Sequence, residues 1–242
     1  DFQGVAYGND TFVAVGNDGK IFSSTDGTTW TAQTSGVDKR LYGVTFENNT
    51  FMAVGNQGTI ITSADGITWA EQTSGITDTL HKVSYANNIF VVSGVDDQTG
   101  AGIILTSADG TTWTAQTSNS ASGLWGTTFG NNTLVMVGDL GTILTSPDGV
   151  TWTAQTSGVT TMLFDVIYSN DLFVAVGVNG IILSSADGNT WIQQTSGSQK
   201  ILRGISFAND TLVAVGDTGT MLTSSVETIS SATVSTVSMS GT

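Results

Sequence analysis

The chain of 242 residues contains no cysteine, a single proline, a single histidine and only six lysine and arginine residues. Without cysteine it can form neither disulfides nor thiolate metal sites, and one histidine cannot supply a histidine metal cluster. The 20 acidic residues bring the formal net charge to −14, which repels phosphate and argues against nucleic acid as a partner. No apolar run approaches the roughly 18 residues of a membrane-spanning helix, so we expect no membrane insertion.

The composition is otherwise that of a folded domain. Hydrophobic residues make up 39% of the chain, which is enough for a packed core, whereas charged residues make up only 11%. The sequence shows no signal peptide and no initiator methionine, so we expect it to be part of a larger multidomain chain. Its Lys-poor, Cys-free and Ser/Thr-rich composition favours an extracellular or cell-surface location in a prokaryote.

Two strings recur along the chain. A string S-x-D-G-x-T-W ends at Trp30, Trp69, Trp113, Trp152 and Trp191, with spacings of 39, 44, 39 and 39 residues. A second string, close to N-N-T-F-V-A-V-G, ends at Gly16, Gly55, Gly94, Gly138, Gly177 and Gly216. The longer spacing contains an insertion near Val95 to Ala101. The chain therefore consists of six units with a period of about 39 residues.

Each unit is expected to contain four strands. In the second unit, segments beginning at Leu41, Thr50, Gly58 and Thr68 are rich in β-branched and aromatic residues. Asn48-Asn49 suits a type I′ hairpin turn between the first two, and no stretch has helical periodicity. We therefore predict an all-β, six-bladed β-propeller of four-stranded antiparallel blades. The blades should start near residues 1, 40, 79, 123, 162 and 201.

The sixth unit departs from the pattern. It has Val226, Glu227 and Ser230 where the Asp, Gly and Trp of the string S-x-D-G-x-T-W, which we call the box, are expected. We expect residues 1–237 to form the propeller, with Thr228 to Val237 supplying the outer strand of the sixth blade. Residues 238–242 would then be a linker toward a following domain. The alternative is that the whole tail is a linker and that residues outside this sequence complete the blade.

The five S-x-D-G-x-T-W strings resemble the Asp-box, or BNR-like, repeat of bacterial β-propellers. That family includes sialidase-like and photosystem II assembly-factor-like proteins, and its string usually has one more residue between Asp and Thr. The resemblance implies that the boxes stabilise hairpins away from any active site. It would also imply an arginine triad for a sialidase, but the chain has only Arg40 and Arg203, which excludes that activity.

The residues of the box suffice for a structural role. Asp26 can accept backbone N–H groups across its turn, Gly27 can adopt the unusual dihedral, and Trp30 can pack between blades. The same reading applies to the other four boxes.

The two ends of the blades are expected to differ in charge. We name the turns between second and third strands and the links between blades the link face, and the other turns the box face. The box face carries acidic hairpins and boxes, whereas all six cationic residues and His81 fall on or beside the link face. Such a gathering of cations would attract an anionic or hydroxyl-rich ligand, or an acidic partner.

One position varies in every unit. It follows the leading apolar residue of each first strand and is occupied by Gln3, Tyr42, His81, Trp125, Phe164 and Arg203. Aromatic, cationic and imidazole side chains around an axial pocket suit a sugar, a planar molecule or a peptide. The predicted ligand-binding residues are Tyr42, His81, Lys82, Trp125, Phe164 and Arg203. The alternative is that these side chains only pack between blades.

Other patterns are weaker. Asp96-Asp97 offers oxygen ligands for calcium but lacks the spacing of a known calcium loop, which favours a solvated loop. Asn9, Asn48, Asn131 and Asn209 each begin an N-x-T sequon that the hairpin turns explain without glycans. No catalytic residue, metal site or cofactor site can be assembled from the sequence.

We therefore expect a non-enzymatic binding or scaffolding module of a larger secreted or cell-surface protein. Its link face would recognise a glycan, a peptide or a protein. One alternative is a carbohydrate-active enzyme of the glycosidase or lyase type, using link-face carboxylates such as Asp38, Asp78, Asp165 or Asp96-Asp97. Another is an assembly factor like the photosystem II assembly-factor-like propellers.

Overall fold

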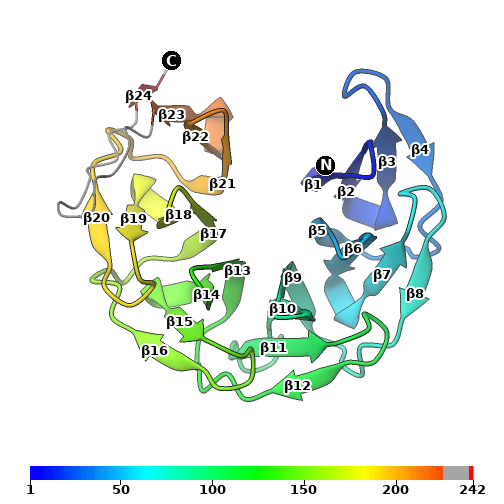
Figure 1. Ribbon diagram of the computed structural model, residues 1–242, viewed down its shortest axis with the longest axis horizontal. Helices are drawn as coiled ribbons and strands as arrows, with labels where there is room; N and C mark the ends of the chain where they lie inside the picture. The colour runs from blue at the N-terminus through cyan, green and yellow to red at the C-terminus, as the bar shows by residue number, and fades with distance from the viewer. Residues whose placement is uncertain (226–239, 242) are drawn as a thin grey trace. The chain divides into compact units, whose positions relative to one another are not determined.

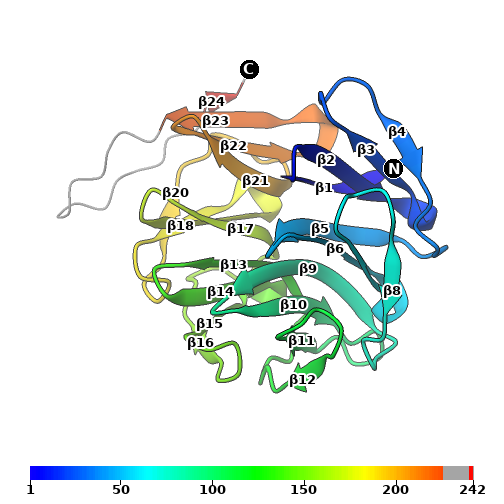
Figure 2. The same ribbon diagram turned by 45° about the vertical axis from the view of Figure 1, so that its right-hand side comes forward.

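The structure, a computed structural model, describes residues 1–225 and 240–241. These residues form six antiparallel sheets of four strands each, and the only helical segments among them are single 3₁₀ turns. The predicted fold class, an all-β six-bladed β-propeller with four-stranded blades, is confirmed. Contacts divide the chain into two compact units, Asp1–Gly123 and Leu124–Thr242, with three blades in each. Within each blade the strands lie side by side in chain order (Figures 1 and 2).

The first unit contains blades 1 to 3. Their strands are β1 (Phe2–Gly8), β2 (Thr11–Gly16), β3 (Ile21–Ser24) and β4 (Thr31–Gln33); β5 (Leu41–Glu47), β6 (Thr50–Gly55), β7 (Ile60–Ser63) and β8 (Ala70–Gln72); β9 (Thr79–Ala86), β10 (Ile89–Val95), β11 (Gly102–Ser107) and β12 (Thr114–Gln116). The 3₁₀ turns η1 (Asn17–Gly19) and η2 (Asn56–Gly58) join the second and third strands of blades 1 and 2. In blade 3 the insertion takes the place of this turn.

The second unit contains blades 4 to 6. Their strands are β13 (Leu124–Gly130), β14 (Thr133–Gly138), β15 (Ile143–Ser146) and β16 (Thr153–Gln155); β17 (Leu163–Ser169), β18 (Leu172–Gly177), β19 (Ile182–Ser185) and β20 (Ile192–Gln194); β21 (Leu202–Ala208), β22 (Thr211–Gly216), β23 (Met221–Ser225) and β24 (Ser240–Gly241). The corresponding 3₁₀ turns are η3 (Asp139–Gly141), η4 (Val178–Gly180) and η5 (Asp217–Gly219).

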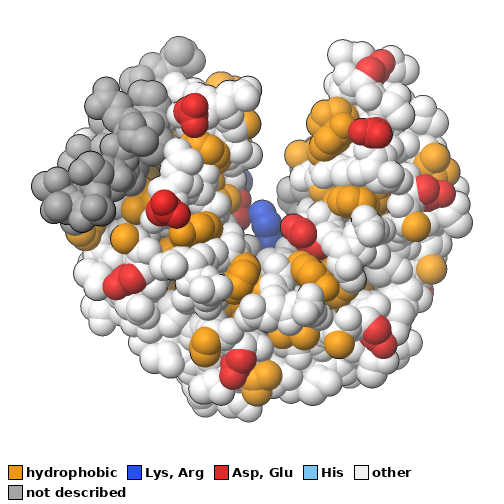
Figure 3. Space-filling view, in the orientation of Figure 1, with side chains coloured by type: hydrophobic (Ala, Val, Ile, Leu, Met, Phe, Trp, Pro, Cys, Tyr) orange, Lys and Arg blue, Asp and Glu red, His pale blue; other side chains and the backbone are white. Residues whose placement is uncertain are grey.

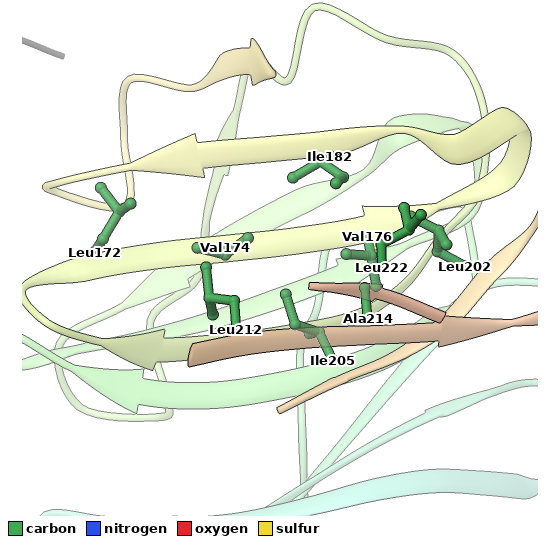
Figure 4. Close-up of a cluster of buried hydrophobic side chains, with 9 residues drawn as sticks. All are labelled: Leu172, Val174, Val176, Ile182, Leu202, Ile205, Leu212, Ala214 and Leu222. Carbon is green, nitrogen blue, oxygen red and sulfur yellow. The ribbon is translucent and has the colours of Figure 1, made fainter. Parts of the chain in front are cut away.

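The core lies between neighbouring blades within each unit. Val13 and Val15 of blade 1 pack against Leu41 and Phe51 of blade 2, and all four side chains are fully buried. Alternate residues of a strand point to opposite faces of the sheet, so Met52 on the other face of blade 2 joins the cluster with blade 3. Figure 4 shows the equivalent cluster between blades 5 and 6, in which side chains of β18 face those of β22.

The boxes close the turns between third and fourth strands in the way the sequence predicts. Asp65 Oδ1 accepts the backbone N–H groups of Ile67 and Thr68, both at 2.8 Å, and the hydroxyl of Ser63 at 3.0 Å. The N–H bond from Thr68, followed by that from Ile67, lowers the pKa of the Asp65 carboxyl. Equivalent bonds are made by the carboxylates of Asp26, Asp109, Asp148 and Asp187. The boxes are therefore hairpin-stabilising elements.

The end of the sixth blade differs from the prediction in one respect. The fourth strand is β24, in which Ser240 pairs with Thr223 and Gly241 with Leu222. It lies in the stretch 238–242 that the sequence predicts to be a linker, whereas the predicted strand at 228–237 lies outside the described residues. The outer edge of β23 offers backbone N–H and C=O groups, and the two-residue segment pairs with this edge at Leu222 and Thr223.

Trp191 should carry a large share of the packing between blades 4 and 5. Its side chain is 9% exposed, joins the cluster that contains Phe173, and donates its indole N–H to the carbonyl of Gly188 at 2.8 Å. We expect Trp191→Ala to lower the free energy of unfolding by about 3–5 kcal/mol, measured by urea denaturation. Trp191→Phe keeps an aromatic ring but loses the indole N–H, and it should cost less, about 1–2 kcal/mol. Equal losses in the two variants would contradict a packing role.

Candidate functional site

The six variable residues predicted from the sequence share one structural feature. In each blade, the pairing register between the first and second strands shifts by one residue, so that one residue of the first strand is left without an opposite partner. These bulge residues are Gln3, Tyr42, His81, Trp125, Phe164 and Arg203. A β-bulge releases a residue from the ladder and re-aims its side chain, which allows this position to vary while the sheet around it repeats.

In the second unit, three bulge residues from successive blades form a row. The Trp125 and Phe164 rings meet edge to face with centroids 5.7 Å apart, and the Arg203 guanidinium lies 5.1 Å from the centroid of the Phe164 ring. The two aromatic side chains are half-buried, and Arg203 is exposed. Both contacts are favourable geometries for aromatic pairs and for cations over aromatic rings. We name these three residues the aromatic–arginine row.

Two aspartates that sequence reasoning overlooked hold this row at its ends. The indole N–H of Trp125 donates to Oδ1 of Asp139 at 2.7 Å. The Arg203 guanidinium donates from Nε to one carboxylate oxygen of Asp217 and from a terminal nitrogen to the other at 3.2 Å. Asp217 raises the pKa of Arg203, and the bond from Arg203 lowers the pKa of Asp217. The sequence signal was available, because each aspartate opens the 3₁₀ turn of the same blade.

In the first unit, the bulge residues of blades 2 and 3 also meet. The Tyr42 and His81 rings lie edge to face with centroids 5.0 Å apart, and the Arg40 guanidinium lies 4.9 Å from the centroid of the Tyr42 ring. Lys82 is half-buried on β9, and Gln3 is exposed on β1. The predicted site residues thus form a Tyr42–His81 pair in one unit and the aromatic–arginine row in the other.

His81 is not suited to act as a cationic donor. Its side chain is only 6% exposed, and the loss of solvation on burial lowers its pKa to about 4. The imidazole is therefore neutral at physiological pH. In this position it contributes a flat packing surface for Tyr42 rather than a positive charge.

The cations of the link face are not an unopposed patch. Lys20 pairs with Asp18 at 3.8 Å, Lys39 with Asp38 at 2.7 Å, and Arg203 with Asp217. The same segments also carry acids, namely Asp18, Asp38, Asp78, Asp96, Asp97, Asp139 and Asp217. Because these acids accompany the cations, the link-face segments do not attract anions as a group. Figure 3 shows that acidic side chains are also spread over the single face that it presents.

The carboxylates considered for an enzyme make structural contacts. Asp165 is 6% exposed and accepts the backbone N–H of Val166 at 3.1 Å and that of Ile205, in the next blade, at 3.2 Å. Asp78 accepts the N–H of Asp97 at 3.2 Å, and Asp96 accepts the N–H groups of its own loop. Among the described residues, no group of three or more His, Asp or Glu side chains is placed to hold a metal ion.

Surface hollows recur beside the links. In the first unit a shallow depression of about 700 Å³ is lined by η1, the end of β4 and the link after it, with Lys20, Asp38, Lys39 and Glu71 at its edges. In the second unit the equivalent position in blade 5 has a depression of about 480 Å³ lined by uncharged residues such as Gln193 and Ser198. Neither depression contains a bulge residue. These two hollows are therefore separate from the residues predicted to bind a ligand.

The fold and these sites define a β-propeller with variable first-strand bulges. A family model described as the DUF6242 beta propeller domain matches residues 1–82. None of the helical segments in the described part of the chain has the length and apolar character that a membrane crossing requires. No curated protein is similar to the chain in sequence.

Solved structures with a similar fold include two of YCF48. "YCF48 bound to D1 peptide" has a TM-score of 0.70 and 16% identity, over 93% of this chain and 77% of that chain. "YCF48 from Cyanidioschyzon merolae" has a TM-score of 0.68 and 17% identity, over 92% and 81%. The WD40 beta propeller domain of Doa1 has a TM-score of 0.74 and 15% identity, over 98% and 82%. At these identities the likeness concerns the fold alone.

The burial of His81 predicts a pH dependence of stability. A histidine whose pKa falls from 6.5 to about 4 on folding binds more protons when unfolded. The stability that the protein gains by keeping His81 neutral is thus fully present above pH 6.5, and it is lost as the pH falls toward 4. Between pH 7 and pH 5 the free energy of unfolding should drop by about 2 kcal/mol from this group. The leucine of His81→Leu cannot titrate, so this variant should lack the decrease of about 2 kcal/mol when its free energy of unfolding is measured by urea denaturation at pH 7 and pH 5. Identical pH profiles of the parent and the variant would contradict the burial of a neutral His81.

Asp165 should matter for stability rather than for a reaction. Asp165→Ala leaves two backbone N–H groups without their acceptor, and we expect the free energy of unfolding to fall by about 2–4 kcal/mol. Asp165→Asn retains an acceptor oxygen and should lose clearly less. Unfolding curves in urea measure both variants. An alanine variant as stable as the parent would show that the two bonds do not support the packing of blade 5 on blade 6.

Proposed function

We propose that this chain is a non-enzymatic binding module that takes an extended peptide segment of a partner protein at its bulge residues. The observation that carries the proposal is the aromatic–arginine row of Trp125, Phe164 and Arg203. Half-buried aromatic rings beside an exposed arginine offer stacking surface and hydrogen-bond donors together, a combination enriched at protein-binding sites.

The charges around the row favour one class of peptide. The row contributes one cation, Arg203, while Asp139 and Asp217 contribute two carboxylates in contact with it. An acidic peptide would meet a cation that is already neutralised, whereas a lysine or arginine side chain finds aromatic faces and carboxylates. We therefore favour a peptide with aromatic and basic residues. The sequence had favoured an anionic ligand or an acidic partner, and the ion pairs of the link-face segments remove the reason for that expectation.

The comparisons support peptide binding at the level of the fold. YCF48, whose fold is similar, has a structure bound to D1 peptide, and this supports a peptide as the ligand of this chain. An assembly factor, which holds a segment of a client protein, would be one form of the same activity.

The Lys-poor and Cys-free composition supports a secreted or cell-surface location as part of this proposal.

The test compares two synthetic peptides that differ only in charge, GSKWKSG and GSEWESG, titrated into the protein by fluorescence anisotropy. The Lys-containing peptide should bind more tightly. The double variant Trp125→Ala, Arg203→Ala should weaken its Kd by at least about tenfold, because the indole stacking surface is removed and the Phe164 ring loses both of its neighbours in the row. Val150→Ala, which truncates a 52% exposed side chain at the other end of blade 4, is the matched control and should bind like the parent.

Other outcomes decide against the proposal. Tighter binding of the acidic peptide would overturn the charge preference. Binding that ignores the double variant would place the site elsewhere. If neither peptide binds and a glycan array yields a ligand that depends on Trp125, the module is a carbohydrate-binding one.

A further inference from the structure

We infer that the bulge residues Trp125 and Arg203 are each positioned by the residue fourteen places later, at the start of the 3₁₀ turn of the same blade. The two positions would act as one recognition unit. This inference rests on the proposed function for its consequences in binding, but its structural part can be tested without any ligand.

Two blades show the unit directly. In blade 4, Trp125 donates its indole N–H to Asp139, and in blade 6, Arg203 donates two bonds to Asp217. The residues of each pair lie fourteen positions apart in the chain. Bonds to a carboxylate are charge-assisted, and the two-point contact of Arg203 also fixes the orientation of its guanidinium plane.

The chemistry of the two positions matches in the other blades that have the turn. The pairs of residues at these positions are Gln3 with Asn17, Tyr42 with Asn56, Trp125 with Asp139, Phe164 with Val178, and Arg203 with Asp217. A bulge residue that can donate a hydrogen bond is matched by a residue with an acceptor oxygen, but only blades 4 and 6 form the bond: Asn17 Oδ1 has no hydrogen-bond partner, and Asn56 Oδ1 accepts from Thr79 at 3.4 Å. Phe164, which cannot donate, is matched by Val178. Blade 3 is the exception, because the insertion replaces its turn and His81 is buried.

The backbone explains why these positions meet. The N–H of the turn residue donates to the carbonyl two residues before the bulge, as Asp217 does to Ile201 at 3.0 Å and Val178 to Met162 at 3.0 Å. The glycine before the turn permits this approach, since a Cβ added to Gly216 would lie 1.9 Å from the Ile201 oxygen. The turn residue is thereby held beside the strand segment that carries the bulge.

Positioning at one blade is transmitted to the next. Trp125 contacts Phe164, and the Arg203 guanidinium lies over the Phe164 ring, so Phe164 lies between two side chains that the turns of their own blades hold. Asp139 and Asp217 are therefore positioning residues for the row. Replacing both the bulge residue and its turn residue should change which peptide side chains are preferred. Replacing the bulge residue alone should leave the new side chain without a hydrogen-bond partner and therefore loosely held.

The first experiment follows the Trp125 indole N–H in the ligand-free protein by NMR. Asp139→Leu removes the acceptor with similar volume, and we expect the indole N–H signal to move upfield and its hydrogen exchange to accelerate at least about tenfold. Asp139→Asn retains an acceptor oxygen and should rescue most of the protection. A leucine variant with the parental signal and exchange rate would overturn the inference.

A transplant provides a second, independent test. Phe164→Trp alone places an indole opposite Val178, whereas Phe164→Trp with Val178→Asp recreates the pair of blade 4. The new indole N–H should be protected from exchange at least about tenfold more strongly in the double variant than in the single one. Equal protection in both would overturn the inference even if the Asp139 variants failed to fold.

Binding then separates this inference from the proposed function. In titrations with GSKWKSG, Asp139→Leu should weaken the Kd by about tenfold and Asp139→Asn by much less. If the parent protein does not bind the peptide while the NMR differences appear, the proposed function is wrong and the pairing stands. If the parent binds and the Asp139→Leu variant binds equally well, the positioning role is refuted.

Discussion

Every blade of this protein depends on a neighbour because its sheet is apolar on both faces. In blade 2, Leu41 and Phe51 pack toward blade 1 while Met52 and Val54 pack toward blade 3, and all are fully buried. The hydrophobic contribution to stability therefore lies between blades rather than within them. This constraint accounts for the regular period of the sequence, since each unit must present the same apolar surface to the next.

The β-bulges allow one residue of each first strand to differ between blades while the packed blade faces remain alike. A residue within the ladder must fit a packed sheet face, but a bulge residue is released from pairing and can range from Gln3 to Trp125 without disturbing the register around it. The 3₁₀ turn beside it varies in step, as Asp139 and Val178 illustrate. The fold thus keeps the chemistry that repeats from blade to blade in the blade faces, and the chemistry that differs between blades at the first-strand bulges.

The charges show how contacts alter a conclusion drawn from composition. Lys39 follows Asp38 directly in sequence, whereas Arg203 and Asp217 lie fourteen residues apart. Only the structure shows that each of these two pairs forms an ion pair. The pairing of Arg203 with Asp217 joins residues from a strand and a turn. It gives an aromatic surface bordered by carboxylates in place of the expected anion-attracting patch, and this is why we propose a basic peptide rather than an acidic one.

The sequence by itself determined the repeat, the six four-stranded blades, the structural role of the box aspartates and the position of the variable residues. These follow from local turn chemistry and from a strict period, both of which are written in neighbouring residues. The tertiary structure alone revealed that the variable residues are bulges, that His81 is buried and neutral, and that Asp165 bridges two blades. Contacts across fourteen or forty residues depend on how strands and blades meet, and burial sets the pKa of His81 only once they have packed.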